Sequence, residues 1–377
     1  MVATPLAQSD SVGSTATAAA WEALAGAPLP TRRQEDWRFT DPAAFSRTEP
    51  CLWTGPDPWA GLTLPEGVTR LEPAVAEHQA VDLLRQTRCA DHWPVRLNSR
   101  AQPAVLGLRV QADAGALVLD LDAAARGEVL ALQLVLVLDA GAELDLALRF
   151  SADGGGLTSA VITAVLAEDA HLSLATAAAG HDAASLLTHV AVVQQPGSAL
   201  ELTSVTAGWG FSRLEPRILQ HAGAASTRLR ALQWVHGAQL ADTHSLVRFE
   251  GPEGSLDQLH KSVADGHGRS VFNGAVQVPR QAQRTNAAQL SRSLLLSDRA
   301  RIDTKPELEI VADDVKCAHG ATVSQLQSDE LFYLRSRGIG EAQAARLLLD
   351  GYCQEVLREL PVELASWDRL VQRLQGA

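Results

Sequence analysis

Cysteines are few in this chain and widely separated, and none lies within three residues of another. This spacing excludes the CxxC pairs of small zinc and redox sites, and four thiols in 377 residues are too few for a disulfide scaffold. We therefore expect a protein of a reducing compartment, the cytoplasm. Cys51 lies in a proline-rich loop, Cys89 at the end of a predicted helix and Cys353 on the apolar stripe of another. Only Cys317 lies where chemistry is plausible.

Long apolar runs and an early basic region are also missing. The longest apolar stretch, residues 129–138, contains Gln133 and is too short to span a membrane, so it predicts a buried strand. No Lys or Arg precedes Arg32, which argues against a secretory signal or a transit peptide. The chain has 32 basic and 44 acidic side chains, a net charge of −12 that phosphates repel. We expect neither nucleic acid nor a membrane as a partner.

Motifs for nucleotide hydrolysis, zinc proteolysis and serine hydrolysis are absent. The triplet at residues 154–156 is three glycines, but no GxGxxG or P-loop follows, so a plain loop is predicted. There is no HExxH and no GxSxG. Five histidines are scattered at uneven spacing and are expected on the surface or hydrogen-bonded in the core: His221, His236, His244, His260 and His267. A charged segment, residues 32–38, is expected to be a solvated face or a partner-binding one.

Between residues 101 and 316 the pattern becomes a repeat of short strands. The segments AGAELDL, EDAHLSL and PGSALEL begin at residues 140, 168 and 196, a period of 28 residues. A later copy surrounds Leu256, and the copy before it, near 225–229, is displaced by one residue. Units this short cannot bury their own apolar face and must stack on neighbours. The pattern favours a β-helix, with an evenly spaced antiparallel β-sandwich as the alternative.

The two ends of the chain are predicted to be helical. We divide the chain into an N-terminal helical domain (1–100), a β-helix core (101–321) and a C-terminal helical domain (322–377). The last domain should contain helices near 328–338, 340–360 and 362–374. The second of these has apolar residues at i, i+3, i+4 and i+7. The fold class is therefore mainly β, with helical domains at both ends.

The segment with most chemical potential contains Cys317 and His319, at the junction of core and C-terminal helices. On a strand, residues two apart face the same side, so these donors can converge. Thiolate and imidazole suit iron, zinc or an iron–sulfur fragment. Two donors cannot complete a four-coordinate site, so a third ligand or a partner chain would be required. A buried cysteine beside a turn histidine is the competing interpretation.

A second candidate is the short helix that follows. Its residues 331–334 are Leu, Phe, Tyr and Leu, which is apolar on nearly every side. Such a helix packs either between two neighbours, or between one neighbour and a partner protein.

Several longer motifs resemble the SufD family of the SUF iron–sulfur cluster assembly system. They are RQEDWRFT at 33–40, DTHSLVR at 242–248, QLHK at 258–261, VFNG at 271–274, LLLS at 294–297, DTKPELEI at 303–310, ADDVKCAHGATV at 312–323 and LFYLRSRGI at 331–339. The resemblance implies a right-handed parallel β-helix core flanked by helical N- and C-terminal domains. It covers the C-terminal half best, and the N-terminal motif is linked to it by weak similarity.

The resemblance also implies a function and partners. It implies a non-catalytic scaffold that pairs with its paralogue SufB through the β-helix edge and binds the ATPase SufC through its C-terminal helices. The subunits would build and transfer a nascent iron–sulfur cluster, shared transiently with SufB, and nothing would bind tightly to the isolated chain. His319 is the expected cluster contact and Cys317 the second. The expected SufC contacts are Leu331, Phe332, Tyr333, Leu334, Arg335, Arg337, Gly338 and Ile339.

Three further expectations remain open. Without SufB, the isolated chain could cover the same edge by forming a homodimer. A carbohydrate-active β-helix enzyme is an alternative, which needs charged residues gathered on one strand face and a secretory signal. A self-contained metal-binding protein is another, which full metal occupancy in the isolated chain would favour.

Overall fold

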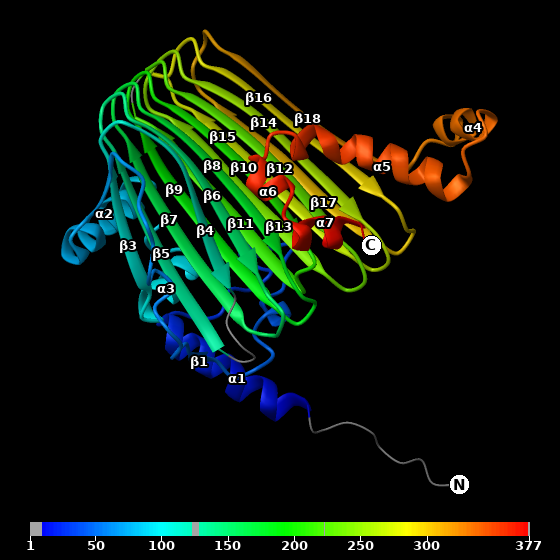
Figure 1. Ribbon diagram of the computed structural model, residues 1–377, viewed down its shortest axis with the longest axis horizontal. Helices are drawn as coiled ribbons and strands as arrows, with labels where there is room; N and C mark the ends of the chain where they lie inside the picture. The colour runs from blue at the N-terminus through cyan, green and yellow to red at the C-terminus, as the bar shows by residue number, and fades with distance from the viewer. Residues whose placement is uncertain (1–9, 123–127, 222, 376–377) are drawn as a thin grey trace.

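The chain forms a parallel β-solenoid whose strands alternate between two stacked sheets (Figure 1). The computed structural model describes residues 10–122, 128–221 and 223–375. We call the ten-stranded sheet, ordered β17-β15-β13-β11-β9-β7-β5-β3-β2 with β1 beside β5, sheet A. Sheet B has eight strands in the order β18-β16-β14-β12-β10-β8-β6-β4. The β-helix is confirmed, and the sandwich alternative is wrong because the strands pair in parallel along each sheet.

From β4 to β18 the strands have similar lengths, whereas β1 and β2 are short. Sheet A contains β1 (Cys51–Leu52), β2 (Val68–Arg70), β3 (Ala104–Val110), β5 (Glu128–Leu138), β7 (Leu157–Leu166), β9 (Ser185–Gln194), β11 (Phe211–Gln220), β13 (Leu240–Phe249), β15 (Arg269–Val278) and β17 (Arg301–Ile310). Sheet B contains β4 (Asp113–Asp122), β6 (Glu143–Ser151), β8 (His171–Ala179), β10 (Ala199–Ala207), β12 (Ser226–Val235), β14 (Ser255–Ala264), β16 (Asn286–Leu295) and β18 (Lys316–Ser324). Strand β2 is antiparallel to β3.

The sequence repeat corresponds to one turn of the solenoid. In sheet B, Glu143 pairs with His171 and His171 with Ala199, so each turn advances the chain by 28 residues. Ala199 then pairs with Ser226, a step of 27, which is the displaced copy seen in the sequence. The next step, to Ser255, is 29 residues. The repeat is therefore set by the register of neighbouring strands. The turns between strands vary in length, which accounts for the steps of 27 and 29 residues.

The apolar run 129–138 lies in β5 and is buried on both faces. Leu132, Leu134 and Leu136 point into the core between the sheets. Val129 and Val135 point outward and pack under the N-terminal segments. A parallel strand covered on both sides requires apolar residues at nearly every position, which explains why this run does not alternate.

Helices from the two ends of the chain cover opposite faces of the solenoid (Figure 1). The N-terminal layer contains α1 (Asp10–Ala25), the short 3-10 helices η1 (Glu35–Trp37) and η2 (Pro42–Ala44), α2 (Pro73–Gln86) and α3 (Trp93–Arg100). It packs on the outer face of sheet A, where Leu84 and Val95 contact Val161 and Ala191.

The C-terminal helices pack on the outer face of sheet B. They are α4 (Ser328–Ser336), α5 (Glu341–Leu357), α6 (Val362–Ala365) and α7 (Asp368–Gln375). Cys353 and Val356 of α5 pack against strand residues that include Val205 and Leu232, which confirms the apolar stripe predicted for this helix. The helix predicted at 362–374 is wrong as a single element, because residues 366–367 separate α6 from α7. The loop predicted at the three glycines is confirmed between β6 and β7.

Candidate functional site

The last two strands leave one end of the solenoid open. β17 and β18 are terminal in the strand orders of sheets A and B, so each has a strand neighbour on one side only within the described residues. No residue of either strand is fully buried, whereas β15 is buried at most positions. Parallel edge strands present unpaired backbone groups that favour the addition of another chain.

Cys317 and His319 lie on β18, at this open end. Cys317 packs against the apolar core between the sheets. Since strand residues two apart share a face, the His319 side chain lies on the same, inner side. His319 is exposed because no further turn covers it, and its register partner is Gln289 of β16. The structure therefore places both donors on one strand and excludes the turn position of the competing interpretation.

The Cys317 side chain is a thiol rather than a thiolate in this structure. Partial burial raises its pKa, so it is protonated at neutral pH. Within the described part of the chain, no third His, Cys, Asp or Glu lies close enough to complete a metal site with Cys317 and His319. Any ion held by this pair would need ligands from outside the described residues.

The apolar residues of α4 are on the surface rather than in the core. Phe332 is 73% exposed and Tyr333 58% exposed, and α4 has no buried residue. The Arg337 guanidinium lies over the Tyr333 ring at 5.3 Å, and Gly338 ends the helix with a φ of +85°. Figure 1 shows α4 projecting beyond the solenoid at the end of α5. The interpretation that this helix packs between two neighbours within the chain is therefore wrong, and its aromatic residues remain available to a partner.

A rigid support carries α4. Its neighbour α5 is anchored on sheet B by Lys261, whose Nζ donates to the backbone carbonyl of Tyr352 at 2.7 Å and pairs with Glu355 at 2.5 Å. The Tyr352 hydroxyl also donates to a backbone carbonyl of β16 at 2.6 Å. Arg335 pairs with Glu341 at 3.4 Å across the α4–α5 turn. These contacts fix α5 on sheet B and join the exposed helix α4 to it.

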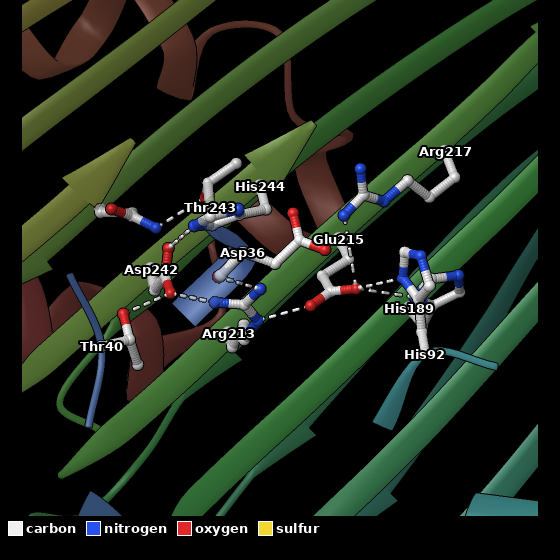
Figure 2. Close-up of polar contacts among 11 residues, drawn as sticks. Asp36, Thr40, His92, His189, Arg213, Glu215, Arg217, Asp242, Thr243 and His244 are labelled. Carbon is white, nitrogen blue, oxygen red and sulfur yellow. Dashed lines mark hydrogen bonds and ion pairs between the residues drawn. The ribbon is translucent and has the colours of Figure 1, made fainter. Parts of the chain in front are cut away.

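A buried ion network between sheet A and the N-terminal layer has no counterpart in the sequence predictions (Figure 2). The Arg213 guanidinium pairs with both Glu215, at 2.5 Å, and Asp242. It also donates to the backbone carbonyl of Asp36 at 2.9 Å and lies 4.1 Å from the Trp37 ring centroid. All three charged side chains are at most 3% exposed. The network ties the segment at residues 36–40 to the solenoid.

The charges of this network are mutually stabilised. Burial alone would raise the pKa of Glu215, but the Arg213 guanidinium and hydrogen bonds from two histidines hold it well below its usual range. Burial is likewise outweighed at Asp242, whose pKa is lowered by Arg213 and by His244. Thr40 donates its hydroxyl to Asp242 at 2.5 Å. Both carboxylates are therefore ionised acceptors at neutral pH.

The scattered histidines have different environments. His221 and His267 are exposed, as expected, and the buried His244 lies 3.2 Å from Asp242. For His260 the expectation of a surface or hydrogen-bonded position is wrong. This residue is fully buried, neither ring nitrogen has a hydrogen-bond partner, and the ring stacks on Phe272 with centroids 4.3 Å apart. Burial lowers its pKa to about 3, so the ring is neutral.

The charged segment 32–38 is only partly a solvated face. Its charged side chains are exposed, but Trp37 between them is buried. Glu35 pairs with Lys305 of β17, and this contact brings the N-terminal layer to the open end of the solenoid.

The fold and the site together define a class of protein: a helix-flanked parallel β-solenoid with an open end that carries Cys317 and His319. Residues 121–352 match the family model described as "SUF system FeS cluster assembly, SufBD core domain". The chain belongs to this SufBD family of the SUF iron–sulfur cluster assembly system and is SufD-like.

Named relatives agree with this assignment. The chain is 46% identical over 172 residues to an iron-sulfur cluster assembly SufBD family protein of Synechocystis. It is 42% identical over 171 residues to the chloroplastic protein ABCI7 of Arabidopsis thaliana. It is 36% identical over 155 residues to the iron-sulfur cluster assembly protein SufD of Escherichia coli. These alignments cover 46%, 45% and 40% of this chain and 38%, 36% and 37% of the relatives.

Among the helices that the structure describes, none combines the length and the apolar character that crossing a membrane requires.

Proposed function

We propose that this chain is a non-catalytic scaffold subunit of a SUF-type complex, in which it pairs with a SufB-like paralogue and binds a SufC-type ATPase. The observation that carries the proposal is the position of Cys317 and His319 on the exposed terminal strand of a SufBD-family core. A nascent iron–sulfur cluster at this end would take His319 as a ligand, with Cys317 as the second candidate. The remaining ligands would come from the paralogue.

The pairing surface is the open end formed by β17 and β18. What supports this surface is its exposed backbone edge together with exposed apolar side chains, since Val311 is 58% exposed and Val323 47% exposed. The same edge could close a homodimer when the paralogue is absent. We propose that the complex is cytoplasmic, which fits four cysteines that form no disulfide in the described structure.

The ATPase contact is α4 with the start of α5. Exposed aromatic residues flanked by arginines are the usual composition of an interface centre. The contact set is the one expected from the sequence, with Phe332 and Tyr333 at its centre. Because only residues 325–327 separate β18 from α4, a movement imposed on α4 by a nucleotide cycle would reach the open end through this short connection.

The test is co-expression of this chain with its paralogue and the ATPase, followed by cluster assembly on the purified complex. His319→Ala should leave the complex intact and abolish cluster formation, measured by iron, acid-labile sulfide and visible absorption. His78→Ala, which removes an exposed histidine of α2 in the N-terminal layer, is the matched control. Normal cluster yield from the His319 variant would contradict the assigned role.

The partner contact is tested separately. The double variant Phe332→Ala and Tyr333→Ala should lose co-purification of the ATPase while retaining the paralogue. Val362→Ala, which removes a 70% exposed apolar side chain from α6, should retain both. Full retention of the ATPase by the double variant would exclude α4 as its docking helix.

A further inference from the structure

Three potential metal ligands meet where the N-terminal layer packs on sheet A. Cys89 and His92 lie in the turn between α2 and α3, and His189 lies on β9. The Cys89 Sγ and one ring nitrogen of each histidine are all within 4.8 Å of one another, the one such group of three in the described residues. Figure 2 shows the two imidazole rings together at the Glu215 carboxylate. Cys89, which the sequence left without a chemical role, is fully buried.

Glu215 orients both histidines. Its Oε2 lies 3.3 Å from Nδ1 of His92 and 3.2 Å from Nδ1 of His189. An ionised carboxylate only accepts hydrogen bonds, so both Nδ1 atoms carry the proton and the Nε2 lone pairs remain available. The His189 Nε2 is buried and has no hydrogen-bond partner. Metal-binding histidines usually donate their other ring N–H to a carboxylate or a carbonyl, which fixes the tautomer and strengthens the metal bond.

The charge around the cluster also suits a bound cation with a thiolate. Burial raises the pKa of Cys89 to about 11, so the thiol stays protonated in the empty protein and donates to the Thr87 carbonyl at 3.2 Å. A metal ion would displace this proton. The buried Arg217 guanidinium, two of whose nitrogens have no hydrogen-bond partner, lowers the Cys89 pKa and would stabilise the thiolate formed.

We propose that Cys89, His92 and His189 bind one divalent transition-metal ion, zinc or ferrous iron. One sulfur and two imidazole nitrogens suit these ions and not magnesium or calcium, which prefer oxygen. Zn–S and Zn–N bonds of about 2.3 and 2.0 Å place tetrahedral ligands about 3.5 Å apart. Because the donor atoms lie within 4.8 Å of one another, none has to approach another by more than about 1.3 Å. His92 is 25% exposed, which leaves the fourth position accessible to water.

The bound ion would join the α2–α3 turn to β9. This site is independent of the open end, because its ligands come from the N-terminal layer and sheet A, whereas Cys317 and His319 are on β18 of sheet B. A test of metal binding at this site therefore does not depend on whether the chain takes part in cluster assembly.

The test is titration of the full-length chain, purified with a chelator and then freed of it, with Co²⁺ as a spectroscopic probe. We expect one equivalent to bind with the charge-transfer absorption of a cobalt–thiolate bond, and Zn²⁺ or anaerobic Fe²⁺ to displace it. Competition between these two ions then identifies the preferred one. Thermal unfolding should shift upward with ligand concentration.

Four variants locate the ion. Cys89→Ser and His92→Gln should each weaken metal binding by at least about 100-fold. If the buried serine impairs folding, His92→Gln still tests the site, because it removes only a partly exposed ring. Cys317→Ser and Cys51→Ser should retain the cobalt–thiolate band. The proposal is overturned if the wild-type chain binds none of the three ions. It is equally overturned if the band survives in both Cys89→Ser and His92→Gln.

Discussion

Replacing Arg213 by methionine should destabilise the protein severely at neutral pH. The variant keeps an unbranched, apolar side chain but removes the guanidinium that lies over Trp37, and it leaves Glu215 and Asp242 buried without their shared cation. Removing one partner of a buried ion pair costs about 3–5 kcal/mol. Because Arg213 serves two carboxylates, we expect a loss of about 4–5 kcal/mol in the free energy of unfolding. A typical domain has only about 5–15 kcal/mol in total.

The loss should depend on pH with a defined sign. In the wild type, both carboxyl groups have lowered pKa values, so they stabilise the fold above their unfolded pKa of about 4 and this contribution disappears as the pH falls further. In Arg213→Met, desolvation without the cation raises both pKa values, so the folded variant binds protons more tightly than the unfolded one. The variant's deficit should therefore narrow as the pH falls from 7 to 4.

Urea unfolding followed by tryptophan fluorescence measures the deficit, because Trp37 lies against the substituted side chain. Arg109→Met is the matched control, since its pair with Asp139 is half exposed and should cost at most about 1 kcal/mol. Adding Asp242→Asn and Glu215→Gln to Arg213→Met should restore part of the stability. A cost below about 1 kcal/mol, or a deficit that widens in acid, would refute the reasoning.

Two further substitutions test other buried groups. His260→Leu should flatten the acid side of the stability profile: the wild-type ring has a pKa of about 3 when folded and about 6.5 when unfolded, so the unfolded state binds the extra proton. His260 thus lowers the free energy of unfolding by about 1.4 kcal/mol for each pH unit below 6.5. Urea unfolding at pH 6.5 and at pH 5 should show a smaller loss of stability in the variant than in the wild type. Tyr352→Phe removes the hydrogen bond to β16 and should cost about 1 kcal/mol in thermal unfolding, and an unchanged midpoint would exclude Tyr352 as an anchor of α5.

The solenoid was predictable because its signal is local and repeated. The leucines that define each 28-residue copy, such as Leu144, Leu172 and Leu200, are register neighbours in β6, β8 and β10. A residue's position within a copy therefore predicts its neighbour in space. The two-residue alternation of a strand is also a local signal, and it predicts that Cys317 and His319 share one face.

The ion network and the metal cluster could not be predicted in this way. Arg213 and Asp242 are one turn apart in sheet A, but Thr40 and Trp37 come from a segment that contains no repeat. Its path over sheet A depends on aromatic packing that alternation does not encode. Cys89 and His92 are three residues apart, which was a usable hint, but His189 follows almost a hundred residues later.

The interior of the solenoid becomes polar toward its open end. Early turns fill it with leucines, whereas later turns contain an amide chain in which Gln289 donates to Gln258 at 2.9 Å and Gln258 donates to Ser245 at 2.8 Å. Exposing an apolar turn costs about 25 cal/mol per Å² of surface, while amides can exchange these bonds for water at small net cost. The end that carries His319, the register partner of Gln289, is therefore the end at which the proposed partner would bind and dissociate at the lowest cost in free energy.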